Sequence, residues 1–194
     1  MRAQALFTTI FAASASAGVL PRAQQSNTFR LEVNVLNYDL TPSINGARVG
    51  FQMTDACLSD LLVEEGDGSI FYQSKATVLS PEANGPGSES AGIIVTPGGT
   101  ATVPSRRYVQ VECGNSTQGV QLEWIRETET SRLQYEAGTW MACPALDNES
   151  RIGIVYRRAG QRTLQGCAEV ELLSICDSTG GNPEGSEPMN CKSA

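Results

Sequence analysis

Carboxylates are the side chains of this sequence that are numerous enough to suggest catalysis. Glu169 and Glu171 are two positions apart in an alternating segment, so they would lie on one face of a strand about 7 Å apart. A glycosidase needs two carboxyl groups roughly 5 to 10 Å apart across a cleft. An exposed strand face of an acidic protein would carry the same pair, and we favour that interpretation. Glu64, Glu65 and Asp67 form a second group beside a glycine-rich turn, where we expect them to be solvated.

Other catalytic and metal chemistry is limited by the absence of histidine. Without histidine there is no Ser-His-Asp triad, no Cys-His dyad and no His-ligated metal site. Asp147, Asn148 and Glu149 cluster as calcium ligands can, but the spacing of an EF-hand is missing, so we interpret them as a turn. We therefore predict no metal, no cofactor and no catalytic residue.

The two tryptophans are candidates for a platform that stacks on a sugar ring. Trp124 alternates with Val120 and Leu122, and Trp140 begins a segment that ends in a cysteine. Both patterns are typical of core positions, so we predict that both side chains are buried.

The six cysteines predict disulfide bonds, since the number is even and no C-x-x-C pair occurs. Six cysteines allow 15 pairings, and the sequence alone does not choose among them. We favour Cys143–Cys167, because these residues flank one predicted hairpin. A Cys176–Cys191 bond would tie the tail to the last strand, which leaves Cys57 to pair with Cys113.

The N-terminus predicts export from the cell. Residues 1–17 combine Arg2, an apolar or small stretch and an Ala15-Ser16-Ala17 cleavage signal, so the mature chain would begin at Gly18. Disulfides persist in oxidising compartments, which agrees with a secreted protein. Asn115 and Asn148 each begin an N-x-Ser/Thr sequon in a polar turn, so we predict a glycan at both.

The charge balance limits the classes of partner. The chain has 14 basic and 21 acidic residues, and removal of the signal takes away Arg2, so the mature charge is 13 − 21 = −8. An acidic surface repels phosphate, which argues against nucleic acid and anionic membranes as partners. We expect a monomer that contacts a cell-wall polysaccharide or a host protein.

The hydrophobic pattern has a period of two and predicts an all-β protein. Phe29, Leu31, Val33 and Val35 alternate with polar residues, and about nine to eleven such segments are separated by turn residues. We predict a compact antiparallel sandwich or a partly closed barrel. Residues 28–176 would form a single domain, between a flexible arm at 18–27 and a disordered acidic tail at 177–194. The tail would be restrained only if Cys191 is bonded.

Two stretches resemble small secreted proteins of filamentous ascomycete fungi. They include T28–L36, S43-I-N-G46, D55-A-C-L58, I70-F-Y72, G119-V-Q-L-E-W124, G138-T-W-M-A-C-P144, I154-V-Y156 and G166-C-A-E-V-E-L172. The resemblance is to a fungal secreted domain of unknown function and, more loosely, to the phialide-type cell-wall proteins. It implies an exported, β-rich, disulfide-bonded protein of the cell wall or medium, and it supports pairing Cys143 with Cys167.

The function expected from this combination is a non-enzymatic secreted fungal protein, wall-associated or released, that acts through its surface. A host-interaction role belongs to the released form. The alternatives are a carbohydrate-binding module and a carboxylate-based glycoside hydrolase that acts on wall polysaccharide. A module would need a row of exposed aromatic rings, whereas a hydrolase would need two facing acids in a cleft.

Overall fold

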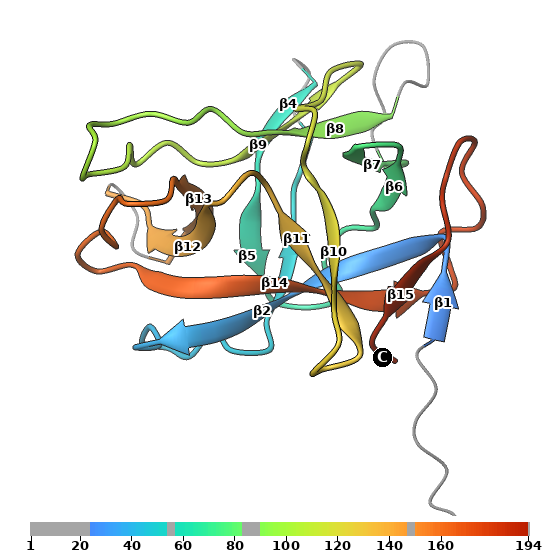
Figure 1. Cartoon of the computed structure of the whole chain (residues 1–194), viewed down its shortest axis with the longest axis horizontal. Coiled ribbons are helices and arrows are strands. Elements are labelled where there is room, and N and C mark those ends of the chain that lie inside the picture. The colour runs from blue at the N-terminus through green and yellow to red at the C-terminus, as the bar shows by residue number, and fades with distance from the viewer. Residues whose placement is uncertain (1–23, 54–56, 83–89, 147–149, 194) are drawn as a thin grey trace, which may run out of the picture.

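The protein is all-β in the computed structural model, which describes residues 24–53, 57–82, 90–146 and 150–193 (Figure 1). The predicted signal and the start of the arm lie outside these residues. Among the described residues, no helix has the length and hydropathy needed to cross a membrane. The strands are β1 (Gln24–Ser26), β2 (Thr28–Asn37), β3 (Arg48–Gly50), β4 (Leu58–Asp60), β5 (Leu62–Glu64), β6 (Tyr72–Ser74), β7 (Thr77–Ser80), β8 (Ala91–Ile94), β9 (Gln110–Cys113), β10 (Gln121–Ile125), β11 (Thr130–Gln134), β12 (Thr139–Pro144), β13 (Ile152–Arg157), β14 (Ala168–Asp177) and β15 (Met189–Cys191).

A closed six-stranded antiparallel barrel forms the centre of the molecule. Its strands follow the order β14, β12, β13, β5, β3, β2, and the pairing of β2 with β14 closes the ring. This closing pair is long, running from Glu169 opposite Asn37 to Asp177 opposite Thr28. The all-β prediction is therefore confirmed, with a closed barrel in place of a partly closed one. Closure removes the exposed strand edges that an open sheet presents.

The second sheet consists of five strands in the order β4, β9, β8, β7, β6 and lies beside the barrel in Figure 1. The two sheets share a core, because Phe29 of β2 exchanges both backbone hydrogen bonds with Phe71, each 2.8 Å long. Their rings pack with centroids 6.1 Å apart. The alternation predicted for β2 is confirmed, since Phe29, Leu31 and Val33 are fully buried.

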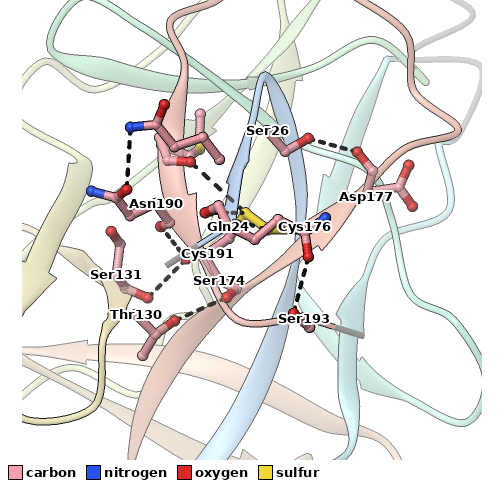
Figure 2. Close-up of a disulfide and its surroundings, with 12 residues drawn as sticks. Gln24, Ser26, Thr130, Ser131, Ser174, Cys176, Asp177, Asn190, Cys191 and Ser193 are labelled. Atoms are coloured by element: carbon pink, nitrogen blue, oxygen red, sulfur yellow. Dashed lines mark hydrogen bonds between the residues drawn. A yellow bond between two sulfur atoms is a disulfide. The ribbon is translucent and has the colours of Figure 1, made fainter. Parts of the chain in front are cut away.

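The C-terminal segment differs from the disordered tail that we predicted. The Cys176–Cys191 disulfide holds β15 against the end of β14, and β15 pairs with β1 (Figure 2). The backbone N–H of Cys176 donates to Lys192 O at 2.9 Å, and that of Lys192 donates to Ser174 O at 3.0 Å. Composition suggested disorder, but the crosslink and these hydrogen bonds order the segment. The same pairing places residues 24–26 of the predicted flexible arm in a strand.

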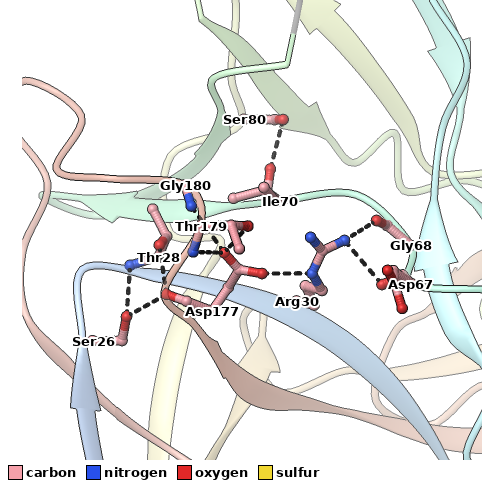
Figure 3. A network of polar contacts seen from close by, with 10 residues as sticks. All are labelled: Ser26, Thr28, Arg30, Asp67, Gly68, Ile70, Ser80, Asp177, Thr179 and Gly180. Atoms are coloured by element: carbon pink, nitrogen blue, oxygen red, sulfur yellow. Dashed lines mark hydrogen bonds and ion pairs between the residues drawn. The ribbon is translucent and has the colours of Figure 1, made fainter. Parts of the chain in front are cut away.

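Asp177 links the end of the barrel to the turns around it (Figure 3). Its carboxylate accepts hydrogen bonds from Arg30 Nε at 2.6 Å and from Thr179 N and Gly180 N at 2.7 and 2.9 Å. The Arg30 guanidinium also donates to the carbonyl groups of Asp67 and Gly68. Burial opposes ionisation of Asp177, but these hydrogen bonds outweigh it and hold its pKa below the ordinary value.

Candidate functional site

The favoured Cys143–Cys167 disulfide is present, and the other two disulfides join Cys57 with Cys113 and Cys176 with Cys191. The Cys57–Cys113 bond lies in the five-stranded sheet, where it crosslinks the start of β4 to the end of the neighbouring strand β9. It therefore constrains the edge strand that leads into the cleft described below.

The acid pair of β14 is held in ion pairs on the outside of the barrel. Glu169 contacts Arg157 at 2.8 Å, and Glu171 contacts Arg132 at 2.7 Å. Arg132 also contacts Glu123 at 2.9 Å. Each carboxylate of the pair is thus engaged by an arginine from another strand. The arrangement fits a charged strand face, the interpretation favoured from the sequence.

The two tryptophans have different environments. Trp140 is buried as predicted, and its indole N–H donates to Leu133 O at 2.8 Å. The prediction for Trp124 is wrong, because 37% of this side chain is exposed. Its strand, β10, lies at the end of the sheet order and pairs only with β11 among the described strands. The two side chains therefore do not form a shared stacking platform.

The sequon at Asn115 lies in the turn after β9, where the side chain is exposed and its Nδ2 donates to Glu112 at 3.1 Å. The sequon at Asn148 and its neighbours Asp147 and Glu149 lie outside the described residues. Glycosylation at both asparagines stays a prediction. Among the residues that the structure describes, no cluster of Cys, Asp and Glu suits a metal ion.

The three acidic residues around the glycine-rich turn, Glu64, Glu65 and Asp67, lie in three different environments. Asp67 lies in the exposed turn itself, where its carbonyl accepts from Arg30. Glu65 is exposed and lines an outer hollow with Pro42 and Leu146. Glu64 is half-buried and faces a different cleft, so the prediction that it is solvated holds only in part.

This cleft, which we call the junction cleft, lies where the chain passes from the five-stranded sheet into the barrel. Between β4 and β5, the buried Leu61 donates its N–H to Val109 O at 2.8 Å and accepts from Ile154 N at 2.9 Å. The chain therefore belongs to one sheet before this residue and to the other after it. The cleft encloses about 440 Å³ and is lined by Gln52, Leu58, Ser59, Asp60, Leu62, Glu64, Gln110 and Arg151. Its volume falls within the range of small-molecule sites.

Asp60 is held in place on one side of the junction cleft. It lies opposite Gln110 in the pairing of β4 with β9. Its Oδ1 accepts from Gln110 Nε2 at 3.3 Å, and its Oδ2 contacts Arg151 at 2.5 Å. Both oxygens of this carboxylate are thus engaged, and the three side chains present donors and acceptors in fixed positions.

Glu64 differs, because its carboxylate makes no hydrogen bond or ion pair with any described residue. Arg48 lies directly opposite it across β3 and β5, but the Arg48 guanidinium contacts Glu32 at 2.6 Å instead. The Glu64 carboxyl group lies over Gly50, where an added Cβ would overlap its Oε2. Burial, and then the nearby charge of Glu82, raise the pKa of Glu64.

We expect Glu64→Gln to stabilise the protein at neutral pH. A carboxyl group whose pKa is raised on folding binds its proton more tightly in the folded state, so its ionisation lowers stability as pH rises through that pKa. Glutamine removes this cost, which predicts a small rise in melting temperature at pH 7 and none at pH 3. Thermal unfolding at both pH values measures it, and a lower melting temperature at pH 7 would contradict it.

Sequence reasoning missed the residues that line this cleft together with Glu64. Asp60, Gln110 and Arg151 are tens of residues apart and belong to no local motif. The one sequence feature that pointed to this cleft was the group of acidic residues beside the glycine-rich turn, which included Glu64. The pairing of β4 with β9 brings Gln110 beside Asp60, and the pairing of β13 with β5 brings the segment that follows Arg151 beside β5.

Comparison with family models gives one match, a Domain of unknown function (DUF7907) that covers residues 26–176. No curated protein and no solved structure matches the chain. The matched span begins at the end of β1, ends at Cys176 in β14, and includes the barrel, the five-stranded sheet and every residue of the junction cleft. The chain therefore belongs to the DUF7907 family.

Proposed function

We propose that the protein is a secreted, non-enzymatic binding domain that acts through its surface at the fungal cell wall or in the medium. The observation that carries this proposal is the junction cleft, a hollow with hydrogen-bonding side chains in its lining, in which Glu64 lacks a described partner. A carboxyl group in a cleft whose pKa is raised by burial and by a nearby charge is a candidate for a functional site. The three disulfides support an extracellular location.

The fungal and cell-wall parts of this proposal rest on the sequence resemblance. A wall polysaccharide is the partner that we favour over a host protein, because the cleft is lined mainly by hydrogen-bonding side chains. The centre of a protein–protein interface is instead depleted of charged residues.

The test is binding of the disulfide-intact mature protein to a panel of fungal and plant wall polysaccharides, with reducing-sugar release measured in the same samples. We expect binding without release. A failure to bind any polysaccharide in the panel would contradict the wall-binding function and direct the search to protein partners.

A carboxylate-based hydrolase is the second candidate function. Because Glu64 lies in the junction cleft, it is a better candidate for the catalytic acid than Glu169 or Glu171 on β14. A raised pKa suits a general acid, and Asp60 is an ionisable group in the same cleft. Both oxygens of Asp60 are engaged by Gln110 and Arg151, which leaves neither free to attack or to activate water. Sugar release that disappears in Glu64→Gln would establish the hydrolase and overturn the binding function.

A further inference from the structure

The junction cleft has the features of a site for a positively charged group. Glu64 carries its charge without a described partner, and Glu82 adds a second negative charge nearby. The one arginine of the lining, Arg151, is already neutralised by Asp60. The cleft is therefore negative where Glu64 lies, and a cation there would gain a charge-assisted hydrogen bond.

The rest of the lining indicates what surrounds that cation. Gln52, Ser59, Gln110 and the Asp60–Arg151 pair offer both donors and acceptors, which suits hydroxyl groups, since each hydroxyl donates and accepts. Leu58 and Leu62 supply apolar contact on the same wall. A bare metal ion fits poorly, because no described group of three ligating side chains is present.

Gly50 shapes the position of the Glu64 carboxyl group. The side of β3 and β5 that carries Arg48 and Glu64 also carries Gly50, and its missing side chain leaves the space in which the carboxyl group lies. Any larger residue at this position would displace Oε2. The Glu64 carboxylate thus lies in the space that a side chain at position 50 would occupy.

We propose that the junction cleft binds a saccharide that carries a free primary amine, with the ammonium group at Glu64 and the hydroxyl groups at Asp60, Gln110 and Arg151. The inference rests on the proposed function and names its ligand class, an amino-sugar unit of a wall polysaccharide. The net negative charge of the protein favours approach of such a cationic polymer.

The probes are a glucosamine oligomer and an N-acetylglucosamine oligomer of equal length, which differ in the acetyl group that removes the positive charge of each amine. Calorimetric titration of the full mature chain should show the free-amine form binding at least about ten-fold more tightly than the acetylated form. Equal affinity for the two would overturn the proposal.

Variants distinguish binding in the junction cleft from general attraction of a cation to the acidic protein surface. Glu64→Gln and Gly50→Ala should each weaken binding of the glucosamine oligomer by about ten-fold or more, since one removes the charge and the other displaces it. Glu65→Gln is the matched control. It removes the same charge from the neighbouring residue, outside the cleft, and should change affinity by no more than about two-fold.

The remaining outcomes have separate meanings. An equal loss of affinity in Glu64→Gln and Glu65→Gln would show that binding depends only on long-range charge attraction, and it would overturn the proposed site. A lysine-rich peptide that binds as tightly and is equally sensitive to Glu64→Gln would assign the cleft to a protein partner and overturn the saccharide. Binding to neutral glucan, unaffected by Glu64→Gln, would keep the proposed function but overturn this inference. Because Glu64→Gln is expected to be more stable than the native protein at pH 7, its loss of binding cannot be ascribed to unfolding.

Discussion

Replacing Cys57 and Cys113 together by alanine is expected to lower the free energy of unfolding by about 4 kcal/mol. The disulfide links residues 56 positions apart, the longest of the three separations, so it restricts the unfolded chain most. Urea unfolding followed by tryptophan fluorescence measures the change.

The other two disulfides provide an internal control of this reasoning. Cys143–Cys167 spans 24 positions and Cys176–Cys191 spans 15, so their removal should cost about 3.5 and about 3 kcal/mol. A loss below about 1 kcal/mol for the Cys57–Cys113 pair would contradict the chain-entropy explanation. The Cys57–Cys113 variant should also weaken ligand binding more than the Cys176–Cys191 variant, because only the former bond anchors β4 beside the junction cleft.

Asp177→Ala is expected to cost about 3 kcal/mol, because it leaves the Arg30 guanidinium without its carboxylate partner. The two side chains are 7% and 19% exposed, so solvent replaces the lost contact only in part. The same change removes the acceptor for Thr179 and Gly180, which hold the turn after β14 (Figure 3). Arg30→Ala and the double variant complete a cycle that isolates the energy of the pair.

The effect of Asp177 should depend on pH. Its pKa is lowered in the folded state, so its contribution to stability is complete above the unfolded value near 3.8 and is lost as pH falls through the lower, folded value. The difference between the native protein and Asp177→Asn should therefore be constant from pH 5 to 7 and shrink below pH 4. Asparagine keeps an oxygen acceptor for the turn, so it should cost less than alanine. A difference that grows in acid would refute the assignment.

Local patterns in the sequence predicted the strands and the all-β class. The alternation of Phe29, Leu31 and Val33 is enough to define a buried face, because side chains on a strand point to opposite sides in turn. The even cysteine number predicted disulfides, and the flanking of one hairpin by Cys143 and Cys167 led to the correct pairing of these two residues. These features depend on residues that are near one another in the chain.

Composition was misleading at the C-terminus and at Trp124. The last residues are rich in glycine, proline and serine, which by themselves favour disorder. Their order comes from the Cys176–Cys191 disulfide and from β1, which lies more than 150 residues earlier and pairs with β15 (Figure 2). Trp124 has the pattern of a core residue, but no described strand pairs beyond β10, so part of its ring is exposed.

The sequence by itself determined which chemistries are absent, since a chain without histidine has no histidine ligand or base. It also determined the acidic charge, the strand pattern and the cysteine number. Only the tertiary structure decided that Glu169 and Glu171 are paired with arginines and that Glu64 is not. Glu169 and Glu171 meet arginines from other strands, whereas the arginine opposite Glu64 is engaged by Glu32. The free energy of a charge depends on its neighbours in space, and the pairing of strands brings those neighbours together from distant parts of the chain.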